Sequence, residues 1–158
     1  QVAESRTATV QGEGERIAIG AGVRDCVILK SSRSGFTGFL RDEYTTLPDV
    51  ADRILATAMT ATWRYRTADL DFNLTWRAVR TTLVETFAEH DSQSVQHTLH
   101  AMGQAVLDNV EAVSAIRLVM PNKHHLPVDL SRLGLENRNE IFVPTDEPYG
   151  LIEASLIR

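Results

Sequence analysis

A run of five residues, Pro121 to His125, holds the side chains best suited to chemistry: Pro-Asn-Lys-His-His. It lies between two short runs that favour extended structure, residues 116–120 and 126–130. The proline cannot donate to a sheet ladder and biases its predecessor towards an extended conformation, so we expect a kink or bulge. Because residues two apart in an extended chain share a face, Asn122 and His124 should point into one space. The alternative is a strand with a polar break at the surface.

Two amphipathic helices are expected to position this segment. Apolar residues recur at steps of three and four in each, which marks a buried face without a cofactor-binding role. The first stripe consists of Phe72, Trp76, Val79, Leu83 and Phe87, after the possible caps Asp71 and Asn73. The second stripe consists of Val95, Leu99, Met102, Val106 and Val110, after possible caps in residues 91–94.

The rest of the chain favours strands. They are expected at residues 6–10, 16–20, 23–30, 61–65, 115–130 and 140–157, the last with a turn at 147–150. The first two should form a hairpin because a polar linker with two glycines, residues 11–15, separates them. Residues 31–35 read as a loop, and Pro48 opens a short helix through Leu55. Strands, two helices and further strands, in this order, predict an α+β domain with an antiparallel sheet and the helices on one face.

Composition limits the partners. The chain has 158 residues and a net charge of −5, which argues against nucleic acid or an anionic membrane as a partner. Cys26 is the single cysteine and lies in an apolar run, so we expect a buried thiol and a reducing compartment. No apolar run approaches the roughly 18 residues of a membrane helix. The chain begins at Gln1 rather than Met, so we expect a piece of a longer polypeptide.

Four stretches together carry a family resemblance. They are Ser34-Gly35-Phe36-Thr37-Gly38-Phe39 with Asp42–Leu47, Asp52-Arg53-Ile54-Leu55, Ser94-Val95-Gln96, and Pro121-Asn122-Lys123-His124. In this order and spacing they resemble the C-terminal half of urate oxidase (uricase), and Tyr149–Ile152 resembles the last strand of that family. The resemblance implies a single T-fold (tunnelling-fold) domain over residues 1–158, with a four-stranded antiparallel sheet and two helices on one face.

The resemblance also implies an activity. Family members oxidise urate with dioxygen and water to 5-hydroxyisourate and hydrogen peroxide, and they use no metal or organic cofactor. Each subunit carries two T-fold domains and assembles into a tetramer. The implied partners are therefore urate, dioxygen, an N-terminal half and further subunits. The C-terminal Leu156-Ile157-Arg158 lacks a Ser-Lys-Leu peroxisomal signal, so a bacterial cytoplasm is expected.

Four residues match the substrate-binding residues of the family. Phe36 matches the aromatic that stacks on the purine, and an aromatic face can stack on any purine. Arg53 and Gln96 match the pair that grips its polar edge, where a planar guanidinium and an amide supply complementary hydrogen bonds. Val95 matches the residue whose backbone N–H contacts the substrate, at a helix start where free N–H groups favour an anion.

Two further residues match the reactive end of the family's site. Asn122 matches the amide that holds dioxygen or water over the ring, and His124 the histidine of a proton relay, a role that suits a pKa near neutrality. In the family, a lysine and a threonine from the N-terminal half of a neighbouring subunit complete this relay. Neither Lys30 nor Lys123 matches that lysine, so activity should require the other half.

Two alternatives stay open from the sequence. One is a non-catalytic T-fold module that binds a purine or a pterin, or serves as an assembly subunit. The other is a metalloenzyme that uses His97, His100, His124 and His125, although their spacing matches no metal-binding motif.

Overall fold

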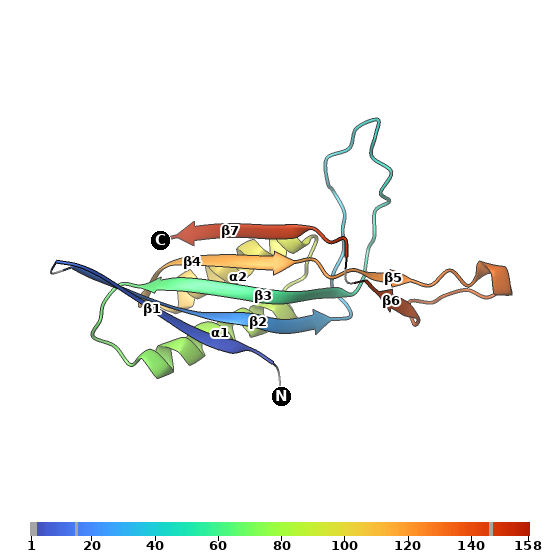
Figure 1. The fold of residues 1–158 in the computed structure, drawn as a ribbon. Helices are drawn as coiled ribbons and strands as arrows, with labels where there is room; N and C mark the ends of the chain where they lie inside the picture. Colours follow the sequence, from blue (N-terminus) through green and yellow to red (C-terminus); the bar gives the residue numbers. More distant parts are fainter. Residues whose placement is uncertain (1–2, 15, 146) are drawn as a thin grey trace.

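The computed structural model describes residues 3–14, 16–145 and 147–158. Five strands form the main antiparallel sheet in the order β1-β2-β3-β4-β7 (Figure 1). They are β1 (Ser5–Glu13), β2 (Arg16–Lys30), β3 (Leu55–Tyr65), β4 (Val113–Pro121) and β7 (Leu151–Ile157). The helices are α1 (Phe72–Glu89) and α2 (Val95–Asn109), between β3 and β4. A separate two-stranded sheet pairs β5 (His125–Pro127) with β6 (Phe142–Pro144), and the 3-10 helix η1 (Ser131–Leu133) lies between them.

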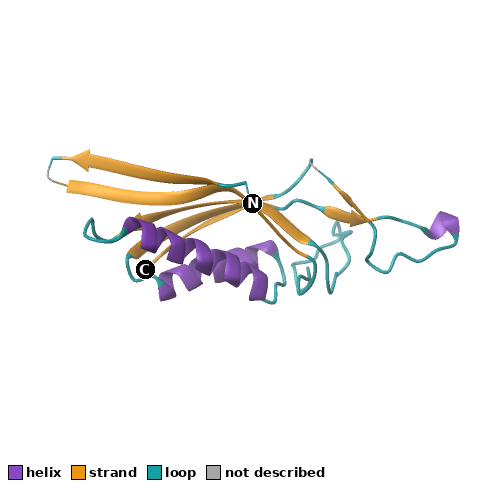
Figure 2. Cartoon of the chain, turned by 90° about the horizontal axis from the view of Figure 1, so that it is seen from below, coloured by secondary structure: helices purple, strands orange, loops and turns teal. Residues whose placement is uncertain are grey.

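The two helices pack side by side on one face of the main sheet, and the other face carries no helix (Figure 2). This confirms the α+β class and the placement of the helices. The sheet has five strands where four were expected, because three strands precede the helices. Residues 16–20 and 23–30 form one strand, β2, whose register with β3 shifts between Val23 and Cys26. β2 therefore pairs with β1 on one side and with β3 on the other.

The helix predictions are confirmed at both caps and in the core. The Asp71 carboxylate accepts hydrogen bonds from the backbone N–H groups of Asn73 and Leu74 at the start of α1, and the Ser94 hydroxyl accepts one from His97 at the start of α2. The predicted stripes bury Val79, Leu83 and Phe87 from α1, and Val95, Leu99, Met102, Val106 and Val110 from α2. In the part of the chain that the structure describes, no helix is long and apolar enough to cross a membrane.

The β1–β2 hairpin is also confirmed. Its register runs from Ser5 opposite Arg24 to Glu13 opposite Arg16. Gly14 takes a φ of +58° at the turn, a value that glycine adopts without strain. Glu15, which belongs to the predicted linker, lies outside the described residues.

Four predicted segments are wrong in type or extent. Residues 48–55 form no helix, because Val50 is held in an extended bridge with Phe36 and Leu55 already begins β3. β3 accordingly begins six residues before the predicted strand at 61–65. The predicted strands 115–130 and 140–157 each divide into two strands that belong to different sheets, β4 and β5 in one case and β6 and β7 in the other.

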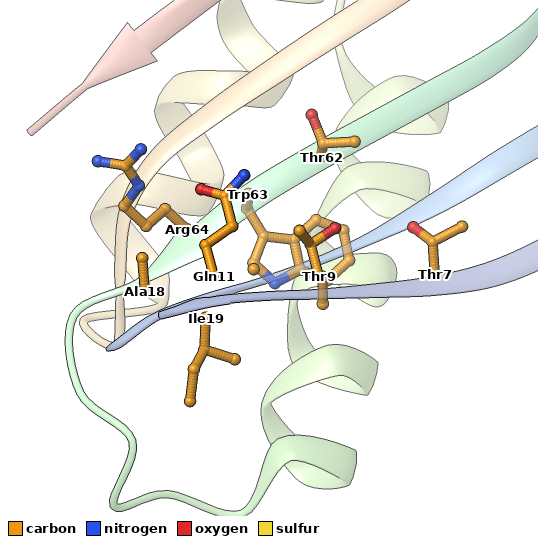
Figure 3. Close-up of a pocket in the computed structure, with 10 residues that line it drawn as sticks. Thr7, Thr9, Gln11, Ala18, Ile19, Thr62, Trp63 and Arg64 are labelled. Atoms are coloured by element: carbon orange, nitrogen blue, oxygen red, sulfur yellow. The ribbon is translucent and has the colours of Figure 1, made fainter. Parts of the chain in front are cut away.

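The uncovered face of the sheet is polar where β1, β2 and β3 meet. A shallow hollow of about 150 Å³ lies there, lined among others by Thr7, Thr9, Thr62 and Arg64 (Figure 3). A Cβ on the neighbouring Gly22 would lie 2.6 Å from the carbonyl oxygen of Ala61, so only glycine lets the two strands approach this closely there. We assign no ligand to this hollow.

Candidate functional site

One large cavity lies at the end of the main sheet where β4 ends and β7 begins. Its volume is about 640 Å³, and its lining is mostly apolar with a few polar groups, which is typical of a small-molecule site. The loops after β2 and β4 and the start of α2 supply most of its walls. All six residues singled out in the sequence line it: Phe36, Arg53, Val95, Gln96, Asn122 and His124.

The loop after β2 is folded on itself by paired backbone hydrogen bonds. Phe36 and Val50 exchange N–H to carbonyl bonds of 2.7 and 3.0 Å, and the Arg53 N–H donates to the Ser34 carbonyl at 2.7 Å. The Asp52 carboxylate accepts from the Ser34 N–H at 3.0 Å. These bonds fix the distance between the backbones that carry Phe36 and Arg53.

The same loop is joined to the segment before α2. Gly35 donates to the Ser92 carbonyl at 2.7 Å, and Ser92 donates to the Arg33 carbonyl at 2.9 Å. A Cβ on Gly35 would lie 3.0 Å from the carbonyl oxygens of both Val50 and Ala51, so its missing side chain permits this close packing. Gly35 therefore sits at the junction of three segments that bring cavity residues together.

Arg53 is a half-buried cation at the cavity wall. Its Cζ lies over the Phe36 ring, 5.2 Å from the ring centroid, and its buried Nε has no hydrogen-bond partner in the described part of the chain. Burial lowers the pKa of the guanidinium, yet arginine stays charged at neutral pH. Within the described residues, no carboxylate lies within salt-bridge distance of it. A planar anion bound in the cavity would supply the partner that these described residues do not.

The first turn of α2 faces the same cavity. Val95 and Gln96 are its first two residues and both line the cavity. The first intrahelical backbone bond of α2 is donated by Thr98 to Ser94, so the amides of Val95 and Gln96 precede the helical ladder. The first turn carries no acidic residue that would compete for them. Free amides at a helix start favour a negatively charged or polar ligand edge.

The connection from β4 to β5 forms another part of the cavity wall. Asn122 donates its N–H to the Gly150 carbonyl at 2.9 Å, and Lys123 donates to the Ala56 carbonyl at 3.0 Å. The His124 carbonyl accepts from the Thr145 N–H at 2.9 Å. The strand is interrupted here, because β4 ends at Pro121 and β5 begins at His125, and long-range bonds anchor the segment on both sides. Asn122 and His124 both line the cavity, as their spacing predicted.

Other features of the titratable residues bear on the sequence predictions. Cys26 is fully buried, and burial raises the pKa of its thiol to about 11, so it behaves as a small core residue. The Lys30 ammonium is buried and donates to the His90 carbonyl, and neither lysine belongs to the cavity lining. Over residues 3–14, 16–145 and 147–158, no three His, Cys, Asp or Glu side chains are placed to hold a metal ion.

Two further polar residues line the cavity. His125, named in the sequence as a possible metal ligand but not as a substrate contact, lines the wall beside His124, and Asn139, which was not singled out, reaches it from the connection between β5 and β6. Asn139 has a φ of 59°, a left-handed conformation that asparagine tolerates better than most residues. Its place in the polar run Asn137–Glu140 indicates a turn, but nothing local indicates that this turn folds back to the cavity.

Comparisons with known proteins agree with this geometry. The Uricase family model matches residues 19–153. The uricase of Arthrobacter globiformis is 46% identical over 155 residues, 98% of this chain and 51% of that protein. The uricase of Danio rerio is 40% identical over 143 residues, 87% of this chain and 48% of that protein. The crystal structure of the Arthrobacter globiformis uricase superposes with a TM-score of 0.96 at 45% identity, covering 100% of this chain and 55% of that one. The chain thus spans about half the length of the curated relatives it matches, and its T-fold is confirmed.

Proposed function

The chain belongs to the uricase family, and from this premise we propose that residues 1–158 are the C-terminal T-fold domain of a urate oxidase. The reaction takes urate, dioxygen and water to 5-hydroxyisourate and hydrogen peroxide, without a metal or an organic cofactor. An N-terminal half completes the active unit, and such units associate into a tetramer in a bacterial cytoplasm.

The observation that carries this proposal is the state of Arg53. A half-buried guanidinium, which has no ion-pair partner among the residues that the structure describes, lies over an aromatic ring, 5.2 Å from its centroid, at the wall of the cavity. A purine anion stacked on Phe36 would place its polar edge in the same layer as this guanidinium. The amides at the start of α2 would then meet a second part of that edge, with the side chain of Gln96 donating and accepting beside them.

The reactive roles fall to the part of the wall that the β4–β5 connection forms. Asn122 holds dioxygen or water over the face of the purine, and His124 passes protons between that water and the protein. Because neither lysine of this chain belongs to the cavity lining, the remaining relay groups come from the N-terminal half.

The outer surface supports association with that half. β1 and β7 are the edge strands of the main sheet, and exposed edges pair readily with another chain. On β7, Leu151 and Ile157 are 61% and 78% exposed, so this edge offers apolar side chains that a partner could cover.

The test is to express the two halves separately, mix them, and follow urate absorbance and hydrogen peroxide release with and without a chelator. We expect turnover only from the mixture, unaffected by the chelator. Oxidation by this chain as a lone monomer would refute the need for a second half, and loss of activity with chelator would refute a metal-free reaction. Purine binding without turnover in the mixture would favour the non-catalytic T-fold module.

Arg53→Lys tests the site within the same assembly. The substitution keeps the charge and removes the planar fork, so one charge-assisted hydrogen bond is lost. We expect urate affinity to fall by roughly ten- to a hundredfold. Unchanged affinity in isothermal titration would exclude Arg53 from the binding site.

A further inference from the structure

Phe36 does not face the cavity alone, because a second ring covers it from behind. The Phe39 ring is stacked on the Phe36 ring with centroids 4.5 Å apart and planes 13° from parallel. Gly38 lies between them with a φ of +69°, a left-handed turn that brings the two rings into register. Phe36 lines the cavity and Phe39 does not, so the pair meets the cavity through the Phe36 ring.

The stack continues away from the cavity. The Arg41 guanidinium lies over the Phe39 ring, its Cζ 4.6 Å from the centroid. Arg41 is in turn held by the Asp49 carboxylate, which accepts a 3.0 Å contact from Nη2. At the cavity wall, the Arg53 Cζ lies 5.2 Å from the centroid of the Phe36 ring. One loop, residues 36–53, thus builds a column of the Arg41 guanidinium, the Phe39 ring and the Phe36 ring, with the Arg53 guanidinium at the inner ring, where the cavity opens.

This column has a consequence for ligand binding. An exposed phenylalanine on a loop rotates freely, and the conformational entropy that it loses when a ligand binds lowers the affinity. A parallel ring behind it fixes the plane of Phe36 in advance, and an ion-paired guanidinium fixes the second ring. A flat ligand can then stack on a Phe36 ring that is already oriented, next to the Arg53 guanidinium.

We propose that Phe39 is a positioning residue that holds Phe36 in the plane required for stacking on a purine. The proposal rests on the proposed function, since it assumes that the purine stacks on Phe36. Phe39 touches no substrate and acts only through Phe36. Arg41 and Asp49 support it as the outer layer of the same column.

The experiment compares Phe39→Leu, Phe39→Tyr and Gly38→Ala in the assembled enzyme, with Leu40→Ala as the matched control. Leu40 is the next residue in the loop and is 99% exposed, so its truncation removes a side chain without touching the column. Gly38→Ala keeps both rings but strains the turn at φ +69°. The probes are xanthine, as a planar purine for titration, and urate for steady-state kinetics.

We expect Phe39→Leu to weaken xanthine binding and raise KM for urate by roughly two- to tenfold, with a smaller change in kcat. Gly38→Ala should do the same, while Phe39→Tyr and Leu40→Ala should stay near the parent values. Trypsin should cleave after Arg41 several times faster in Phe39→Leu than in Leu40→Ala, because the column no longer holds the loop. That readout needs no purine.

The outcomes distinguish a failure of the positioning role of Phe39 from a failure of the proposed function. If Arg53→Lys weakens xanthine binding but Phe39→Leu does not, the positioning role is refuted and the proposed function stands. If Phe39→Tyr is as impaired as Phe39→Leu, the aromatic stack is not the cause and the role is refuted as well. If the parent assembly binds neither urate nor xanthine, the proposed function fails and the positioning role fails with it.

Discussion

Gly35→Ala tests the junction that joins three segments of the site. Gly35 donates to the Ser92 carbonyl, and its Cα packs against the carbonyls of Val50 and Ala51. An added Cβ would lie 3.0 Å from each of these two oxygens, which is closer than ordinary van der Waals contact. Backbone bonds of Val50 with Phe36 and of Arg53 with Ser34 fix the chain on both sides of Ala51, so the segments must separate by a few tenths of an ångström.

The magnitude follows from two opposing effects. Forcing a methyl group into a packed site costs about 1–3 kcal/mol. Replacing glycine by alanine also restricts the unfolded chain, which returns about 0.4–1 kcal/mol. We expect a net destabilisation of about 1–2 kcal/mol, or roughly 2–8 °C in melting temperature for a domain of this size. The same separation moves Phe36 relative to the start of α2, so KM for urate should rise as well.

The assay is thermal unfolding followed by circular dichroism, with urate kinetics on the same preparations. Gly12→Ala is the matched control, because it also adds one methyl group to a glycine and no atom lies within 4 Å of the position of its Cβ. We expect the control to melt at or slightly above the parent temperature. A Gly35→Ala variant with the parent melting temperature and the parent KM would show that the junction is loose and the reasoning is wrong.

Two further predictions concern the roles of Asn122 and His124 and the dependence of stability on acid pH. His124→Ala should lower turnover by about 10²–10⁴-fold while xanthine still binds, and Asn122→Ala should mainly raise the dioxygen concentration needed for half-maximal rate. Loss of xanthine binding in both folded variants would instead make the segment structural. The Arg80 guanidinium, hydrogen-bonded to Glu4, lowers the pKa of that carboxyl below its ordinary value of 4.5. The stability from this pair is therefore present above pH 4.5 and lost as pH falls through the lower folded-state pKa. Glu4→Gln should lower the free energy of unfolding at pH 7 by roughly 1.5–3 kcal/mol, which thermal unfolding would show as a lower melting temperature. The difference in melting temperature between variant and parent should shrink at pH 3.

The helices could be predicted because their signals are local. The apolar residues recur at steps of three and four within each helix, and the caps Asp71 and Ser94 stand directly before it. The false helix at 48–55 shows the opposite case, since Val50 is held extended by Phe36, 14 positions away. The breaks after Pro121 and before Leu151 also depend on distant bonds, from Asn122 to Gly150 and from Lys123 to Ala56.

The site residues also differ in how far the sequence could predict them. The polar ones were predicted from residue type and from the family resemblance, and in the structure they line one cavity. The stack of Phe36 on Phe39 was not predicted, although the two rings are only three residues apart. It depends on the left-handed turn at Gly38, and a glycine in a sequence does not reveal which conformation it takes. Asn139 was missed because the arm that carries it folds back over a long distance in sequence.

Because of the direction of the strands, the cavity lies at one end of the main sheet, and the opposite end can carry an attached group without affecting it. β2 ends, β3 begins, β4 ends and β7 begins at the cavity, whereas the β1–β2 turn at Gly14 and the last residue of β7, Ile157, lie at the far end. At roughly 3.3 Å per residue, the seven residues of β7 separate these two ends of the strand by about 20 Å. A dye, surface tether or fused protein attached at the far end would therefore leave the ligand entrance clear, and the same attachment on loop 36–53 would block it.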